Sequence, residues 1–163
     1  FQAVLSSNFS IRGAVGYLDG HYKRVVDPNT GLPFNLPGYP ASAGAGFEYD
    51  PAGQRTVYSP KWSGNIGGTY TIPSSVGNFD LDANLVFSSK SYVQPTNRLA
   101  LPFYQTLNTS ITWTSSDERL GVRLWALNIT DERYLVTGLE SGLGDLIVYA
   151  PPRTYGVTLT SKF

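Results

Sequence analysis

Long stretches in which apolar and polar residues alternate constrain the fold of this chain more than any other feature of its sequence. The clearest stretch spans 78–93. Its odd-numbered positions form the apolar parity, that is, the set of alternate positions that carries the apolar residues Phe79, Leu81, Ala83, Leu85, Phe87 and Val93. A period of two residues is typical of a β-strand with one apolar and one polar face. Further stretches span 9–17, 62–72, 107–113, 120–127 and 155–163. The pattern predicts an all-β chain with about six long strands and the end of another strand at 1–5.

The connections between these strands alternate in length. The short ones cover 6–8, 73–77 and 115–118, and the longer ones cover 28–54, 95–101 and 131–151. In an antiparallel up-and-down meander, successive connections lie at opposite ends of the sheet. The longer loops are therefore predicted to gather at one end, where exposed loop residues often serve recognition.

Two architectures fit this alternation, a soluble β-sandwich and a transmembrane β-barrel. Strands in soluble sheets usually run about 5–6 residues, whereas a strand that crosses a bilayer needs about 9–11 residues. The longer stretches here alternate over about nine to sixteen residues, which favours the barrel. Aromatic residues also mark both strand ends, as at the two interfaces of a membrane. They are Phe9, Tyr70, Phe79, Trp113 and Phe163 near the short turns, and Tyr17, Trp62, Phe87 and Tyr155 near the long loops.

Charge placement is compatible with either architecture. The charges inside the strands all fall on the polar parity, and they are Arg12, Asp80, Asp82, Lys90 and Arg123. A wet barrel lumen and the solvated face of a sandwich both accommodate charges there. A soluble β-sandwich binding module is therefore kept as an alternative.

Composition excludes several classes of function. The 12 basic and 12 acidic residues balance to zero formal charge, which argues against nucleic-acid binding. The absence of cysteine excludes a disulfide scaffold, a thiolate metal site and a cysteine nucleophile. His21 is the only histidine, and neither a catalytic nor a metal-ligand motif surrounds it. No enzyme activity, metal or cofactor is predicted. The sequence contains no run of about 18 apolar residues, so no membrane-spanning helix is predicted either.

Several motifs make the sequence recognisable. Residues 124–134 read Leu-Trp-Ala-Leu-Asn-Ile-Thr-Asp-Glu-Arg-Tyr and resemble the Asn-Leu-Thr/Phe-Asp-x-x-Tyr motif near the end of TonB-dependent outer-membrane receptors. Residues 152–159 resemble the closing strand of that family, and the chain ends in Phe163, as outer-membrane barrel proteins commonly do. Residues 16–19 and 59–65 resemble late strands of the same barrels. The resemblance spans essentially the whole chain.

The resemblance implies that 1–163 is the C-terminal portion of a 22-stranded transmembrane β-barrel. In the family, an N-terminal plug and a TonB-contacting segment complete the receptor, and neither has a counterpart in this chain. The implied parent imports a scarce solute, such as a siderophore, a vitamin or a carbohydrate, across the outer membrane of a Gram-negative bacterium. The implied partners are the lipid bilayer, the plug and remaining strands, the outer-membrane assembly machinery and, through the plug, TonB. With a periplasmic C-terminus, the longer loops are extracellular.

Candidate ligand-binding residues lie in the longer loops and on the polar parity of the strands. They are His21, Tyr39, Phe47, Tyr49, Arg12, Lys90 and Arg123. The apolar run 146–149 is expected to extend the final hairpin above the membrane. The terminal strand resembles the signal read by the assembly machinery, in Tyr155, Val157, Leu159 and Phe163. Removal of Phe163 is expected to impair assembly more than ligand binding.

Six strands leave two unpaired edges, which lipid does not tolerate. Missing sequence, further copies of the chain, or closure into a small barrel of about eight strands would each satisfy these edges. The small self-standing barrel would need extra strands from 43–50 or 144–150. It remains an alternative at this point, together with an oligomeric barrel.

Overall fold

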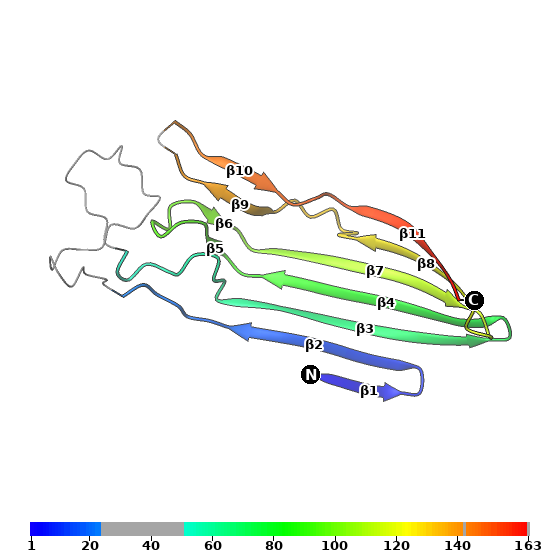
Figure 1. Ribbon diagram of the computed structural model, residues 1–163. Coiled ribbons are helices and arrows are strands. Elements are labelled where there is room, and N and C mark those ends of the chain that lie inside the picture. The colour runs from blue at the N-terminus through cyan, green and yellow to red at the C-terminus, as the bar shows by residue number, and fades with distance from the viewer. Residues whose placement is uncertain (24–50, 142, 163) are drawn as a thin grey trace.

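The structure is a computed structural model that describes residues 1–23, 51–141 and 143–162. The regular elements within these residues are all β-strands (Figure 1). One antiparallel sheet contains, in order, β1 (Gln2–Ser6), β2 (Phe9–Tyr17), β3 (Trp62–Ser74), β4 (Gly77–Ser88), β7 (Tyr104–Thr114), β8 (Leu120–Leu127) and β11 (Thr154–Ser161). Two short ribbons pair β5 (Ser91–Tyr92) with β6 (Ala100–Leu101), and β9 (Leu135–Leu139) with β10 (Leu146–Tyr149). The described residues contain no helix of the length and apolarity that a membrane crossing requires.

The large sheet confirms the predicted strands, with one correction. Each alternating stretch, and the end at 1–5, forms one strand of the sheet in chain order. The stretch 78–93 is too long as predicted, because β4 ends at Ser88. Ser88 is the last residue with partners on both sides, Ser63 of β3 and Tyr104 of β7. Beyond it no strand continues the ladder, and the chain leaves the sheet to form β5.

The register brings the mainly apolar sides of β2, β3, β4, β7, β8 and β11 to one face, whereas Val4 of β1 pairs with Ser10 of the polar face. Directly paired residues on neighbouring strands point to the same side of a sheet. One row across the apolar face consists of Phe9, Tyr70, Leu81, Ile111, Leu124 and Val157. The adjacent row on the polar face consists of Ser10, Thr69, Asp82, Ser110, Trp125 and Gly156. The sheet is therefore two-faced from β2 to β11.

No second layer covers the apolar face in the described part of the chain. Leu124 is 51% exposed and Val157 is 61% exposed, and the buried apolar residues are Val93 and Leu101, outside the large sheet. A β-sandwich would bury this face against another sheet, so the described residues do not form the β-sandwich that was kept as an alternative. The 13 residues of β3 extend about 43 Å, which at a tilt of about 45° covers a hydrocarbon core of about 30 Å. The sheet has the length and polarity of a barrel wall.

The two ends of the sheet differ as the loop lengths predict. Tight turns at 7–8, 75–76 and 115–119 join strands at one end, and both ribbons lie at the other (Figure 1). Gly77 has φ 128°, and a Cβ there would collide with the carbonyl of Thr114, so this tight turn requires glycine.

The sheet is open, with β1 and β11 as its edges. The segment 144–150 does contain a strand, but this strand, β10, pairs only with β9 and adds nothing to the large sheet. The other segment considered for closure, 43–50, lies outside the described residues. The described strands of one chain therefore do not close into a small barrel.

Candidate functional site

Three connections meet at the loop end of the sheet. Loop A denotes 18–23 with 51–61, loop B denotes 89–103, and loop C denotes 128–153. The N–H of Arg55 in loop A donates to Asn97 Oδ1 in loop B (2.7 Å), and Asn97 Nδ2 donates back to the Arg55 carbonyl (3.0 Å). The Tyr58 hydroxyl of loop A lies 2.7 Å from Thr137 Oγ1 of loop C. The three loops form one cross-linked rim.

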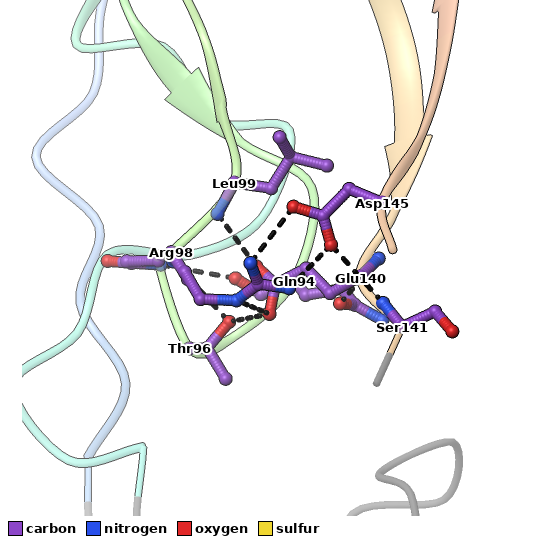
Figure 2. A network of polar contacts seen from close by, with 8 residues as sticks. Gln94, Thr96, Arg98, Leu99, Glu140, Ser141 and Asp145 are labelled. Atoms are coloured by element: carbon purple, nitrogen blue, oxygen red, sulfur yellow. Dashed lines mark hydrogen bonds and ion pairs between the residues drawn. The ribbon is translucent and has the colours of Figure 1, made fainter. Parts of the chain in front are cut away.

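Glu140 is the centre of the contact between loops B and C (Figure 2). Its side chain is only 8% exposed, and its carboxylate accepts hydrogen bonds from the Thr96 hydroxyl (2.6 Å) and the Leu99 N–H (2.8 Å). These donors come from loop B, so the buried charge is satisfied only while the two loops stay together.

Arg98 lies between Glu140 and Asp145 (Figure 2). Its Nε is 3.4 Å from a Glu140 oxygen, and its two terminal nitrogens donate to Asp145 at 2.9 and 2.6 Å. The hydrogen bond to Asp145 raises the pKa of Arg98, and the same bond lowers the pKa of Asp145. Both groups are thus held in their charged forms, as in other two-pronged arginine–carboxylate pairs.

A pocket of about 480 Å³ lies below the rim, where the loops meet the strands. Its strand walls include residues of the polar face, Ser63, Asn65, Val86, Ser88 and Tyr104. Tyr58 and Tyr134 line it from loops A and C. The rings of Tyr104 and Tyr134 stack with centroids 4.1 Å apart, and burial, followed by the neighbouring Tyr104, raises the pKa of Tyr134.

This pocket combines flat aromatic surfaces with several hydroxyl groups. Such a lining suits a small organic solute that offers both apolar and hydrogen-bonding groups. Tyr58 and Tyr104 were not among the residues singled out from the sequence. Two features of the sequence could have pointed to the pocket lining. Tyr104 occupies the polar side of its strand, and Tyr134 ends the receptor-like motif of 124–134.

The motif residues of 124–134 build the entry to loop C. Asn128 is buried, its N–H donates to Asn108 Oδ1 (2.9 Å), and its side chain bonds both the N–H and the carbonyl of Glu132 (3.0 and 2.9 Å). Asp131 accepts a hydrogen bond from the N–H of Arg153, where the loop returns (3.0 Å). Asn128 and Asp131 have φ of 50° and 56°, which asparagine and aspartate tolerate better than most residues. The motif thus holds both ends of loop C together.

Arg12 and Arg123 both lie on the polar face, but they differ in their side-chain partners. Arg12 on β2 donates to Asp82 Oδ2 (2.7 Å) and to Thr69 Oγ1 (3.0 Å), so its charge is compensated within the wall. Arg123 on β8 lies opposite Thr112 and Thr158. Within the described chain it makes no ion pair and no side-chain hydrogen bond. Three strands separate the two arginines, so they do not form one site.

The other predicted loop residues are placed as follows. Lys90 lies between β4 and β5, not in a long strand, with its ammonium 4.9 Å from the Tyr92 ring centroid. His21 Nδ1 is 4.0 Å from Asp19 Oδ1, and no group among the described residues completes a catalytic arrangement there. The described residues also contain no cluster of three metal-ligating side chains. Tyr39, Phe47 and Tyr49 lie outside the described residues.

The proposed assembly residues occupy the edge strand β11. Tyr155, Val157 and Leu159 all lie on the apolar face, and β11 pairs with β8 alone. Phe163 lies outside the described residues. A regular edge strand of this kind is suited to strand addition, and its use as an assembly signal stays a prediction.

Comparison with known proteins identifies solved structures that share the fold of this chain. No protein-family model and no curated protein matches the chain in sequence. The ferric yersiniabactin uptake receptor FyuA from Yersinia pestis is similar over 99% of this chain and 22% of its own, with TM-score 0.76 and 17% identity. The siderophore receptor PiuA from Acinetobacter baumannii is similar over 99% and 20%, with TM-score 0.74 and 18% identity. BauA, the ferric preacinetobactin receptor of the same species, is similar over 97% and 20%, with TM-score 0.66 and 19% identity.

The chain thus spans about a fifth of the length of the receptors that it matches. Over that length it has the fold of a segment of their barrels. The fold expected from the resemblance to TonB-dependent receptors is confirmed.

Proposed function

We propose that this chain forms part of the wall and loop rim of a TonB-dependent outer-membrane receptor that imports a scarce solute. The observation that carries the proposal is the single-layered sheet, whose uncovered apolar face is long enough to cross a bilayer and whose other face is polar. The lipid bilayer is the proposed partner of the apolar face. The role is one of transport and recognition, with no catalysis.

The structural neighbours narrow the choice of solute. Of siderophores, vitamins and carbohydrates, a ferric siderophore is favoured, because FyuA is a ferric yersiniabactin uptake receptor, BauA a ferric preacinetobactin receptor and PiuA a siderophore receptor. The tyrosine-lined pocket below the rim is the proposed contact for such a solute. Among the cations of the polar face, Arg123 is a better candidate than Arg12 for binding this solute, because Asp82 already compensates the charge of Arg12.

The remaining partners follow from the open edges and the polar face. We propose that further barrel strands pair with β1 and β11, and that a plug packs against the polar face and couples it to TonB. The assembly machinery is the proposed reader of β11. In this arrangement the rim is extracellular and the tight turns are periplasmic.

Cysteine labelling of the full-length protein tests the orientation and the membrane location together. These 163 residues contain no cysteine, so single cysteines at Leu143 in loop C and at Glu118 in a tight turn report separately once any cysteine elsewhere in the full-length protein has been replaced by serine. In intact cells, a membrane-impermeant maleimide is expected to label Leu143→Cys and not Glu118→Cys, while lysed cells label both. Equal labelling of the two sites in intact cells would contradict the proposal.

The oligomeric barrel is the second candidate, because the sheet has two free edges. The mass of the denatured polypeptide extracted from outer membranes separates it from the receptor. A mass several times that of 163 residues supports the receptor. A mass near that of 163 residues supports closure by several copies.

A further inference from the structure

An aromatic pair lies on the apolar face where β2 and β3 reach the loop end. Tyr17 and Trp62 are direct partners across the two strands. Their ring centroids are 4.7 Å apart, and the residues are 54% and 48% exposed. Amphipathic rings of this kind favour the boundary between hydrocarbon and headgroups.

A small charged cluster accompanies these rings. The Lys61 ammonium lies over the Tyr17 ring, 5.6 Å from its centroid. Asp19 Oδ2 is 3.9 Å from Lys61, and Asp19 Oδ1 is 3.3 Å from Arg55. One carboxylate is therefore shared by two cations, and the closer one is Arg55. Arg55, Lys61 and Asp19 together carry one positive charge in excess, and Lys61, the cation farther from Asp19, has a side chain that is 41% exposed.

The turn end of the same face lacks this combination. Its rings include Tyr70, Phe79 and Trp113, and Trp113 Nε1 donates to the Val76 carbonyl (3.2 Å). The cation–ring contacts of the described residues involve only Lys61 and Lys90, and neither lies at the turn end. Among the described residues, a cation in contact with a ring of the apolar face is thus found only at the loop end.

We infer that Lys61, with Tyr17 and Trp62, binds the phosphate of a lipid headgroup in the outer leaflet. The inference rests on the proposed function, which places this end of the sheet at the outer interface. A lysine there extends its ammonium to headgroup depth while its stem stays against apolar surface. Phosphate is the complementary anion, and the rings hold the acyl and sugar region beside it.

Lipid binding to the delipidated full-length protein in mild detergent tests the inference, with native mass spectrometry as the readout. The probes are lipid A carrying both phosphates and the same lipid A after dephosphorylation. The phosphorylated form is expected to bind more tightly, and Lys61→Gln is expected to weaken its binding about fivefold. Lys162→Gln removes the same charge at the turn end and is expected to leave binding unchanged.

Three outcomes would overturn the inference. They are equal binding of the two lipids, unchanged binding in Lys61→Gln, and displacement of the lipid by millimolar inorganic phosphate, which would identify a free-phosphate site. The cysteine labelling described above reports the membrane location independently. A correctly oriented protein without phosphate preference would therefore refute this inference alone.

Discussion

The sheet and the loop rim of this molecule are held together by different interactions. In the sheet, backbone ladders join neighbouring strands, and large apolar side chains point away from the protein. In the rim, individual side chains join segments far apart in sequence, such as Glu140 with Thr96 and Tyr58 with Thr137. A wall residue therefore matters mainly through the face that it occupies, whereas a rim residue matters through its particular partners.

A charge on the apolar face is expected to have the largest effect. Leu85 lies on the apolar face between Ile66 and Leu107, midway between the two aromatic bands, and Asn84 lies on the polar face of the same strand. Leu85→Arg is expected to lower the free energy of unfolding by about 2–4 kcal/mol, because the guanidinium enters hydrocarbon. Asn84→Arg is expected to cost less than about 1 kcal/mol. Urea titration of the full-length protein in vesicles measures both, and equal losses would remove the distinction between lipid and lumen faces.

Truncation of a buried rim residue is expected to have the next largest effect on stability. Asn128→Ala leaves the N–H and carbonyl of Glu132 without their side-chain partner, at a cost of about 2–3 kcal/mol. Faster hydrogen exchange in 129–134, with β3 and β4 unchanged, would reveal this local loss. Asn128→Asp keeps the acceptor for the Glu132 N–H and is expected to lose less. A uniform increase in exchange across the sheet would show that rim and wall are not independent.

The pocket is expected to influence solute binding with little effect on the wall. Tyr134→Ala removes the ring that stacks on Tyr104 and is expected to weaken solute binding about fivefold. Tyr134→Phe keeps the ring and isolates the hydroxyl. Tyr149→Ala, on exposed β10 outside the pocket lining, is the matched control. Uptake of labelled ferric siderophore by the full-length receptor measures all three, and equal loss in Tyr149→Ala would exclude the pocket.

Acidification is expected to have the smallest effect. Because the hydrogen bond from Arg98 lowers the pKa of Asp145, this pair contributes fully above the ordinary aspartate pKa and is lost only as the pH falls through the lowered value. The raised pKa of Arg98 keeps the other partner charged throughout. The protection factors of the 96–99 amides, which correct for the intrinsic pH dependence of exchange, should hardly differ between about pH 7 and pH 5, whereas Asp145→Asn should lower them at both. Opening of the unmodified rim within that interval would point to another titrating group.

The faces of the strands were predictable, and the partners within each face were not. Arg12 and Arg123 have the same parity in the sequence, yet register places Asp82 and Thr69 within reach of Arg12 alone. The alternation continues beyond Ser88, so the strand was predicted too long. A local pattern does not show where the neighbouring strands stop. The motif of 124–134 indicated the barrel end, but its hydrogen bonds to Glu132 and Arg153 became visible only in the folded loop.

The sequence by itself determined that the chain forms long two-faced strands, in which order they follow, and at which end the long loops gather. These properties depend on a two-residue period and on the lengths of connections, which are local features of the chain. Only the tertiary structure decided that Tyr58, Tyr104 and Tyr134 share a pocket and that Glu140 joins loops B and C. Such contacts depend on register and loop packing between distant segments, where differences of a few ångströms decide whether a hydrogen bond exists.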